Sequence, residues 1–283
     1  MALAFRLGEA RRDLRTRTLV MGVLNRTPDS FYDHGATFAL DALLRRAEQL
    51  AVEGADVLDV GGVKAGPGPE VTEAEELDRT VPTVEAIRAR LAVPLSIDTW
   101  RSAVLDAACD AGAVVGNDIS GFADPAYLPV AARHGASVVA THIRLAPRVP
   151  DPDPVYADLV GEVRSFLVAR ADAARAVGLD GDQIALDAGL DLGKTPAMSA
   201  VLLRETADLV RLGYPVLLSA SNKRFLGELL GLGIDERRDA SLAAVAYAVA
   251  HGARIVRVHD VAGTVRVCRT VEGILGAAAV PVS

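Results

Sequence analysis

Short apolar runs rich in β-branched residues alternate along the chain with longer segments rich in alanine, leucine, arginine and glutamate. The short runs have the composition and length of buried strands, whereas apolar residues in the longer segments recur with the period of a helix. This alternation is typical of repeated strand-helix units around a parallel sheet. The predicted strands cover residues 18–24, 56–60, 94–98, 113–117, 137–142, 183–187, 215–219 and 254–258.

The helical segments between these strands carry recognisable ends. Thr72 begins the sequence Thr-Glu-Ala-Glu, so Glu75 can complete a capping box at the start of a helix. Glycines that follow a helical pattern and precede a strand are expected as left-handed C-terminal caps. These glycines are Gly54, Gly112, Gly135, Gly178, Gly213 and Gly252. The predicted helices cover residues 39–53, 72–91, 100–111, 156–177, 196–212 and 236–251.

Polar residues stand at the end of almost every predicted strand. They are Asn25, Asp59, Asp98, Asn117, Asp118, His142, Asp187, Ser219 and His259. A doubly wound open sheet is compatible with the same alternation of elements. In a barrel, however, the carboxyl ends of all strands converge on one mouth, where such enzymes build their sites. We therefore predict a single-domain α/β fold, a (β/α)8 TIM barrel over residues 18–283, preceded by an N-terminal extension, residues 1–17.

Composition and charge exclude several classes of function. Of the 283 residues, 51% are hydrophobic and 24% are charged, which fits a globular domain with a large core. A formal net charge of -7 gives no general attraction to nucleic acid or to an anionic membrane. We therefore expect small-molecule partners.

Cysteine usage and the N-terminal sequence favour a cytoplasmic protein. Cys109 and Cys268 lie far apart within apolar helical patterns and are predicted to be buried free thiols. The first 18 residues carry five arginines and no sustained apolar run, which is unlike a signal peptide or a membrane anchor. No later segment is apolar over the length that a bilayer requires.

The segment 21–35, MGVLNRTPDSFYDHG, is rich in turn-forming residues. Thr-Pro-Asp-Ser on its own reads as a surface turn, but the whole run resembles the first signature of dihydropteroate synthases, N-x-T-P-D-S-F. Further segments are similar to the remaining signatures of that family and follow in the same order. They are Asp59-Val60-Gly61-Gly62, Ser96-Ile97-Asp98-Thr99, Asn117-Asp118, Asp187-Ala188-Gly189 with Gly193-Lys194, Asn222-Lys223 and Arg257-Val258-His259.

The resemblance implies an activity and a set of roles. The family joins 6-hydroxymethyl-7,8-dihydropterin diphosphate to p-aminobenzoate and releases diphosphate with the help of Mg²⁺. By resemblance, Asn25 is the metal ligand, and the protein is a homodimer. The implied catalytic residues are Lys223, Arg257 and His259, and the implied aryl-amine pocket consists of Phe31, Pro67, Lys223 and Arg224.

Residue chemistry supports a pterin site at the predicted strand ends. Asp98, Asn117 and Asp187 supply the acceptors and the amide that the edge of an aminopyrimidinone ring requires. The alternative for Asp98 and Asn117 is helix capping. Lys223 stands where a helix should begin, which disfavours a cation unless an acceptor or an anion lies beside it.

Arg257 and His259 alternate with Val258 and should project to the same side of the last strand. An arginine can bind phosphate oxygens in a bidentate manner, and a protonated histidine adds charge, so the pair suits a diphosphate. The alternative for Arg257 is a surface ion pair with Asp260.

The chain departs from the family pattern in the second loop. Family members read G-G-E-S-T-R-P-G there, whereas this chain has Ala65 and Gly66 in place of the threonine and the arginine. Each loss removes a group worth about a few kcal/mol of transition-state stabilisation. Arg224 replaces the serine after Lys223, and Lys64 adds a positive charge. The variants also resemble a second actinobacterial paralogue that is thought not to perform the standard reaction.

Three hypotheses follow for the function. The first is an active synthase with a remodelled aryl-amine pocket, and the second is a noncatalytic pterin-binding paralogue. The third is a folate-dependent methyl-transfer domain, which leaves Arg257 and His259 without an anionic leaving group. A histidine-based metal centre is not indicated, since the five histidines show no close ligand spacing.

Overall fold

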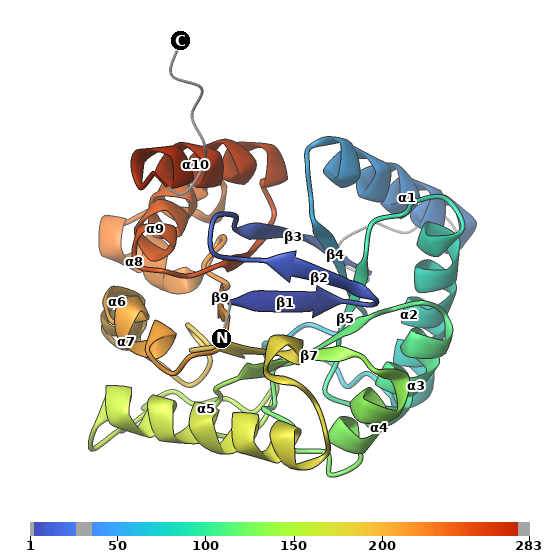
Figure 1. The fold of residues 1–283 in the computed structure, drawn as a ribbon, viewed down its shortest axis with the longest axis horizontal. Coiled ribbons are helices and arrows are strands. Elements are labelled where there is room, and N and C mark those ends of the chain that lie inside the picture. The colour runs from blue at the N-terminus through green and yellow to red at the C-terminus, as the bar shows by residue number, and fades with distance from the viewer. Residues whose placement is uncertain (1–2, 27–35, 277–283) are drawn as a thin grey trace.

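A computed structural model describes residues 3–26 and 36–276 of the chain. Eight parallel strands form a closed barrel, and Figure 1 shows helices surrounding the strands. The predicted barrel is confirmed, and the open-sheet alternative is wrong, because β10 pairs with β3 in parallel and closes the sheet. The strands of the barrel are β3 (Leu19–Asn25), β4 (Val57–Gly61), β5 (Leu95–Asp98), β6 (Val115–Asp118), β7 (Ser137–Thr141), β8 (Ile184–Asp187), β9 (Val216–Leu218) and β10 (Ile255–Val258).

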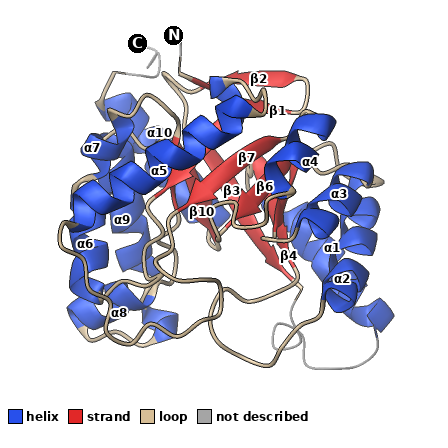
Figure 2. Cartoon of the chain, turned by 90° about the horizontal axis from the view of Figure 1, so that it is seen from below, coloured by secondary structure: helices blue, strands red, loops and turns tan. Residues whose placement is uncertain are grey.

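Helices form the outer layer around the strands (Figure 2). They are α1 (Ala36–Val52), α2 (Glu73–Arg88), α3 (Ser102–Asp110), α4 (Tyr127–His134), α5 (Leu159–Ala176), α6 (Pro196–Arg204), α7 (Thr206–Val210), α8 (Arg224–Leu230), α9 (Arg238–Ala250) and α10 (Val261–Ile274). Short 3₁₀ turns cover Gly181–Gln183 and Ile234–Glu236. None of the helices in the described ranges combines the length and the apolar run that crossing a membrane requires.

The prediction of one helix over residues 196–212 is wrong, because the chain forms two helices that meet at Glu205. The Thr206 hydroxyl donates to the carbonyl oxygen of Leu203 at 2.6 Å. Such side-chain bonds to the backbone compete with the regular helical pattern. Residue 205 therefore ends α6 and caps α7.

Other local predictions are confirmed. The Glu75 amide donates to Thr72 Oγ1 at 3.2 Å, and the Thr72 amide donates to Glu75 Oε2 at 2.8 Å, which completes the capping box of α2. All six predicted cap glycines have positive φ. Cys109 and Cys268 are free thiols, half-buried and buried respectively. The helix ends therefore follow from short-range sequence signals.

The predicted N-terminal extension forms a β-hairpin that closes one end of the barrel. Its strands are β1 (Ala4–Leu7) and β2 (Ala10–Asp13), drawn in dark blue across the barrel opening in Figure 1. Phe5 and Leu14 are fully buried against inward-facing strand residues such as Met21. This end of the barrel is therefore an apolar core, and the long loops lie at the opposite end (Figure 2).

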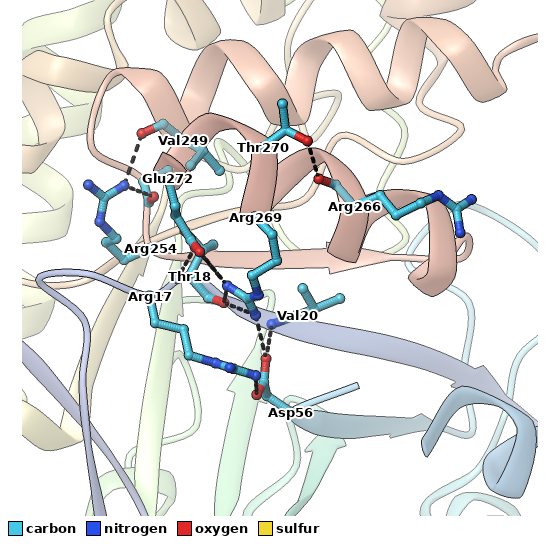
Figure 3. Close-up of polar contacts among 11 residues, drawn as sticks. Arg17, Thr18, Val20, Asp56, Val249, Arg254, Arg266, Arg269, Thr270 and Glu272 are labelled. Atoms are coloured by element: carbon cyan, nitrogen blue, oxygen red, sulfur yellow. Dashed lines mark hydrogen bonds and ion pairs between the residues drawn. The ribbon is translucent and has the colours of Figure 1, made fainter. Parts of the chain in front are cut away.

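A buried glutamate joins the last helix to the beginning of the first barrel strand (Figure 3). Glu272 Oε1 accepts from the Thr18 amide at 2.6 Å and from Arg269 at 2.7 Å. Arg269 also donates to the Thr18 carbonyl oxygen at 3.2 Å, and Asp56 pairs with Arg17 at 3.0 Å. The network satisfies the buried carboxylate, and it fixes α10 at the end of the barrel opposite the polar strand ends.

The hairpin yields a prediction about stability. Replacing Phe5 by alanine leaves a cavity beneath the barrel, so the free energy of unfolding should fall by about 3–5 kcal/mol. Urea denaturation followed by circular dichroism measures the change. The control is Arg12→Ala on the exposed strand opposite, which should shift the value by no more than about 0.5 kcal/mol. Equal effects of both substitutions would contradict a packed hairpin.

Candidate active site

Polar side chains form a layer above the apolar interior, at the carboxyl ends of the strands. Side chains alternate along a strand, and Val57 faces the barrel interior, so Asp59 two residues later faces it as well. The same reasoning places Asn117 after Val115 and Arg257 after Ile255. The sequence prediction that these strand ends converge on one mouth is therefore confirmed.

Arg257 lies at the centre of this layer. Its Nε donates to Asp59 Oδ2 at 2.6 Å, and its Nη2 donates to Asp98 Oδ2 at 2.6 Å. Asn117 Nδ2 donates to the same oxygen of Asp59 at 3.1 Å. The side chain of Asp59 is fully buried, and that of Arg257 is 17% exposed. These contacts join β10, β4 and β5 through charged groups and add β6 through the neutral amide of Asn117.

The alternative of a surface pair between Arg257 and Asp260 is wrong. Asp260 pairs with Arg238 at 2.8 Å, and its Oδ1 accepts from the Gly263 amide at 2.8 Å at the start of α10. Arg257 cannot reach it while bound to two carboxylates on the inner side of the barrel. Val258 and His259 separate the two residues, and Val258 is buried.

The alternative of helix capping by Asp98 or Asn117 is also wrong, since both side chains bond within the polar layer. The neighbouring Asp118 has a local structural role instead. Its oxygens accept from the backbone amides of Ser120 at 2.6 Å and Phe122 at 2.8 Å. Asp118 therefore shapes the turn after β6 and is fully buried.

The polar layer carries more negative than positive charge around Arg257. Burial raises the pKa of Asp98 to about 7, although the Arg257 guanidinium opposes this shift. The second oxygen of Asp59, Oδ1, is buried without a hydrogen bond within the described ranges. An unpaired buried acceptor is costly. The site is therefore suited to a ligand that presents several hydrogen-bond donors.

Asp187 and Lys223 lie on the other side of the mouth. Asp187 Oδ1 accepts from the Gly189 amide at 2.8 Å, and Lys223 Nζ donates to the Leu190 carbonyl oxygen at 2.9 Å. Burial raises the pKa of Asp187, while the Gly189 amide and the Lys223 ammonium oppose the shift. Lys223 is the N-cap of α8, as the sequence predicts. The loop after β8 thus holds both groups.

His259 follows β10 and contacts the loop after β9. Its backbone amide donates to Ser221 Oγ at 3.2 Å, and the same oxygen lies 3.0 Å from His259 Nδ1. Since Oγ accepts from the amide, its hydrogen can be donated to Nδ1, which leaves the ring proton on Nε2. Desolvation and the nearby cations Arg257 and Arg46 lower the pKa of His259 to about 4. At neutral pH the ring is therefore a neutral donor and does not add the positive charge considered from the sequence.

Asn25, the predicted metal ligand, ends β3 with an exposed side chain. Its Oδ1 lies beside Gly61. A Cβ atom added to that glycine would be 3.4 Å from this oxygen. In the part of the chain that the structure describes, no cluster of three histidine, cysteine or acidic side chains could hold a metal ion. Mg²⁺ often keeps several waters and uses few protein ligands together with substrate phosphates. A single asparagine oxygen at this rim is compatible with that mode of binding.

A cavity of about 320 Å³ lies between the second loop and the loops that follow β7 and β8. Pro67 and Arg224, two residues of the predicted aryl-amine pocket, line it together with Ala65 and Gly66. Phe31, which the sequence also assigns to this pocket, lies outside the described residues. Arg224 is exposed and forms an ion pair with Glu228 on the next turn of α8.

Backbone contacts hold the second loop over this cavity. Arg79 donates to the Gly62 carbonyl oxygen at 3.0 Å. The backbone amide of Arg148 donates to the Ala65 carbonyl oxygen at 3.3 Å, and the Arg148 guanidinium donates to the carbonyl oxygen of Pro69. The proline-rich loop after β7 thus lines the mouth.

His142, a predicted strand-end residue, has a supporting role. Lys194 Nζ lies 2.9 Å from His142 Nδ1 and donates at 2.9 Å to the carbonyl oxygens of both Gly189 and Leu192. Burial and the Lys194 ammonium lower the pKa of His142 to about 3, so the ring is neutral and accepts from the lysine. The two side chains fix the loop that carries Asp191 against β7.

Comparison with known proteins identifies the family. The model of the pterin binding enzyme family matches residues 21–259. The chain belongs to this pterin-binding enzyme family. It is 44% identical over 266 residues to a Mycobacterium leprae protein named inactive dihydropteroate synthase 2, covering 92% of this chain and 91% of that relative. The predicted resemblance to dihydropteroate synthases is therefore confirmed.

Two proteins named dihydropteroate synthase are similar to this chain over almost its full length. The dihydropteroate synthase of Synechocystis sp. is 41% identical over 271 residues, covering 95% of this chain and 94% of that relative. A structure of Xanthomonas albilineans dihydropteroate synthase with 4-aminobenzoic acid superimposes with a TM-score of 0.89 at 38% identity, covering 99% of this chain and 100% of that one.

Several residues of the barrel mouth were not among the predicted site residues. The sequence analysis noted Asp59 only as a polar residue at a strand end. Side chains alternate along a strand, so its position within an apolar run was the signal that it faces the barrel interior. Asp191 and Arg148 had no comparable signal, since both depend on loop conformations with positive φ that tertiary contacts determine. Lys194 was noted only within a family signature.

The pKa of Asp98 yields a prediction about pH. Its folded-state value of about 7 exceeds its ordinary value of 3.8, so the folded chain retains a proton that the unfolded chain releases. The corresponding stabilisation is complete below about pH 4 and is lost as the pH rises through about 7. Asp98→Asn lacks this titrating group. The difference in unfolding free energy between the variant and the parent should therefore shift in favour of the variant as the pH rises through this window, by about 1 kcal/mol per pH unit at most.

Denaturation curves of both proteins at several pH values measure this difference. The control is Asp78→Asn, which changes an exposed carboxylate on α2 and should show no comparable dependence on pH. A constant difference between the parent and Asp98→Asn from pH 4 to 7 would argue against a raised pKa.

Proposed function

We propose that the chain binds 6-hydroxymethyl-7,8-dihydropterin diphosphate in the barrel mouth and transfers the pterin to an aryl amine, with release of diphosphate. One observation carries the proposal, namely the layer of buried acceptors around Arg257 at the carboxyl ends of the strands. Membership of the pterin-binding enzyme family supports the same ligand class. The closest chemical fit is a flat heterocycle with several N–H donors.

In this proposal, the pterin is recognised by polar groups that can form further hydrogen bonds beyond those they make within the protein. The orphaned Oδ1 of Asp59 and the carboxylates of Asp98 and Asp187 are acceptors for ring N–H and amino groups. Asn117 fixes Asp59 through its amide nitrogen, which leaves its amide oxygen as a further acceptor. The Lys223 ammonium provides the donor for the ring carbonyl oxygen or a ring nitrogen.

Diphosphate binding is assigned to Arg257, His259 and Asn25. Nη1 of Arg257 makes no hydrogen bond within the described residues, so it is available for a phosphate oxygen, and His259 can donate from Nε2. Asn25 would hold Mg²⁺ through its amide oxygen, with phosphate oxygens and water as the other ligands. When bound, Mg²⁺ supplies neutralising charge for the leaving group.

The proposed reaction needs no covalent bond to the protein. The bond between the exocyclic carbon and the diphosphate oxygen breaks, and its electron pair leaves with the diphosphate. Donors on Arg257 and His259 stabilise that developing charge. The lone pair of the aryl amine then bonds to the pterin carbon, and the amine loses one proton to solvent. The buried carboxylates favour positive charge on the pterin during this step.

A noncatalytic pterin-binding protein is the second candidate function. Ala65 and Gly66 line the aryl side of the mouth without a hydroxyl or a guanidinium. The Mycobacterium leprae relative is named as inactive. In this case the acceptors around Arg257 bind the pterin diphosphate, but the pterin is not transferred to an amine. A homodimer located in the cytoplasm is part of either proposal. The dimer rests on the family resemblance, and the cytoplasmic location rests on the cysteine usage and the N-terminal sequence.

An assay of diphosphate release decides between these candidates. Purified protein is incubated with Mg²⁺, the pterin diphosphate and a panel of aryl amines. Release that requires both substrates supports the transferase. Calorimetric binding of the pterin diphosphate without release supports the noncatalytic candidate, and the absence of binding contradicts both.

Asp187→Asn tests the assignment of the pterin site. An amide retains the size of the side chain and can still accept from Gly189, but it loses the charge that strengthens a hydrogen bond to the ring. The dissociation constant of the pterin diphosphate, measured by calorimetry, should rise about 10- to 100-fold. The control Asp110→Asn, on the exposed end of α3, should bind as the parent does. Unchanged affinity of Asp187→Asn would remove this residue from the site.

The second loop offers a gain-of-function test. A Cβ atom at Gly66 would meet no atom within 4 Å, so the double variant Ala65→Thr, Gly66→Arg should fold normally. If the loop limits the transferase, diphosphate release should increase at least about 10-fold, since one such donor is worth about 100-fold or more. The matched control is Ala65→Val, Gly66→Gln, which adds bulk without the hydroxyl or the charge. An equal rate in both variants would show that the loop does not limit turnover.

A further inference from the structure

A second cavity, of about 670 Å³, lies outside the barrel mouth, between α5 and the loops that follow β6 and β7. It adjoins the cavity beneath the second loop, since Ile143 and Leu145 line both. Within the described part of the chain, none of the groups assigned to the pterin, the diphosphate or the aryl amine lines it. We call it the α5 cavity, and the lining residues that matter for its chemistry are His142, Tyr156, Phe166 and Arg170.

Arg170 brings to this cavity a cation whose donors lack acceptors. Its N–H groups donate no hydrogen bond to residues 3–26 and 36–276, and its Nε is shielded from solvent as well. The guanidinium carbon lies 4.7 Å from the centre of the Phe166 ring, a contact that restrains the side chain. A buried donor without a partner calls for an explanation, and a restrained guanidinium is well suited to a carboxylate.

His142 supplies a second donor beside the same ring. The residue is 5% exposed, and its Nδ1 lies 2.9 Å from Lys194 Nζ. Because Nδ1 accepts from the lysine, the proton of the neutral ring is on Nε2. Nε2 has no hydrogen-bond partner among the described residues, and the ring packs edge-on against Phe166 with the centroids 4.9 Å apart. The free donors of His142 and Arg170 therefore belong to side chains that flank one phenyl ring.

The walls of the α5 cavity are flat and apolar. Phe166 is held against the backbone, since a Cβ atom added to Gly121 would lie only 2.5 Å from its Cζ. The Tyr156 ring lies 6.1 Å from the His142 ring, and its hydroxyl donates to the carbonyl oxygen of Gly193 at 2.8 Å. Fixed aromatic walls favour a ligand with a flat ring over a hydrated inorganic ion.

The acidic residues of the lining are engaged at the start of α5. Glu162 Oε1 accepts from the amides of Ala157 at 2.8 Å and Asp158 at 3.0 Å, and Asp158 Oδ1 accepts from the Gly161 amide at 3.1 Å. Arg170 follows more than two turns later, about 12 Å along the helix axis from Glu162. The cavity therefore has an acidic end, where these carboxylates cap the helix, and a separate cationic end.

We propose that the α5 cavity is a second small-molecule site, which binds an aromatic carboxylate through Arg170 and His142 and holds its ring against Phe166 and Tyr156. The guanidinium would donate two parallel hydrogen bonds to the carboxylate. His142 Nε2 would donate to a carboxylate oxygen or to an acceptor on the ring. The site is separate from the proposed transfer reaction, because the His142–Lys194 contact stands between this cavity and the one beneath the second loop.

Benzoate is the probe for this site, since it has no amine and cannot act as the nucleophile. Its affinity for the full chain is measured by calorimetry at neutral pH, without pterin or Mg²⁺, beside benzamide and acetate. Benzamide lacks the charge, and acetate lacks the ring. Benzoate should therefore bind at least about 10-fold more tightly than either of them.

Substitution of Arg170 tests the assignment of the donor. Arg170→Met keeps a long side chain that can contact Phe166 but removes the guanidinium, so the dissociation constant of benzoate should rise at least about 10-fold. The matched control is Arg45→Met, which removes the same charge from an exposed position on α1. The control should stay within about twofold of the parent.

Two further measurements locate the ligand. Ser165 is an exposed lining residue, so Ser165→Trp should fold normally, fill the α5 cavity and abolish benzoate binding. In crystals of the full chain with 4-bromobenzoate, the anomalous signal of bromine should lie beside Phe166. Thermal unfolding followed by circular dichroism checks that each variant is folded, and Ser165→Trp serves if Arg170→Met folds poorly.

Several results would overturn the inference. They are a parent protein that does not bind benzoate in solution, equal binding of benzamide or acetate, and unchanged affinity in the folded Arg170→Met or Ser165→Trp variant. Bromine in the barrel mouth alone also contradicts it. Bromine in the α5 cavity without calorimetric binding would mean binding at crystal concentration only, which contradicts it too.

Discussion

The structure of the mouth depends on one arginine shared between two buried carboxylates. Arg257 comes from the strand that closes the barrel, and its partners Asp59 and Asp98 come from the second and third barrel strands. Removing one member of such a buried group leaves an uncompensated charge, which is strongly destabilising. The group therefore holds the strand ends in register and leaves the mouth with an excess of acceptors. That excess gives the site its preference for a ligand rich in donors.

The opposite end of the barrel allows this polar arrangement to exist. The hairpin residues Phe5 and Leu14 fill the amino end with apolar contacts, and Glu272 fixes the last helix there. In barrels of this class, the site is built on the loops at one face, while the other face contributes stability. The buried polar groups around Arg257 can consequently be retained for binding, although they contribute little net stability of their own.

The sequence predicted those features that depend on neighbours along the chain. Strands, glycine caps and polar strand ends follow from local periodicity and backbone preference, and all eight barrel strands were found in this way. The contact between Arg257 and Asp59 joins residues separated by 198 positions, and no local pattern encodes it. The hairpin was missed because its outer strand, Ala10–Asp13, is exposed throughout and lacks the apolar run that marks a buried strand. Asp191 was missed because its position depends on a loop conformation with positive φ and on the contact with Ser199.

The differences from the family pattern are concentrated on one side of the mouth. The acceptor layer and Arg257 form the inner side, where each group has the chemistry that a pterin requires. Ala65, Gly66 and Asp191 all line the outer cavity, together with the cations Arg148, Lys194 and Arg224. A change of the second substrate and a loss of transfer both require alterations in this cavity and an intact inner site. The two candidate functions therefore share one structural basis and differ only in whether an amine reaches the pterin carbon.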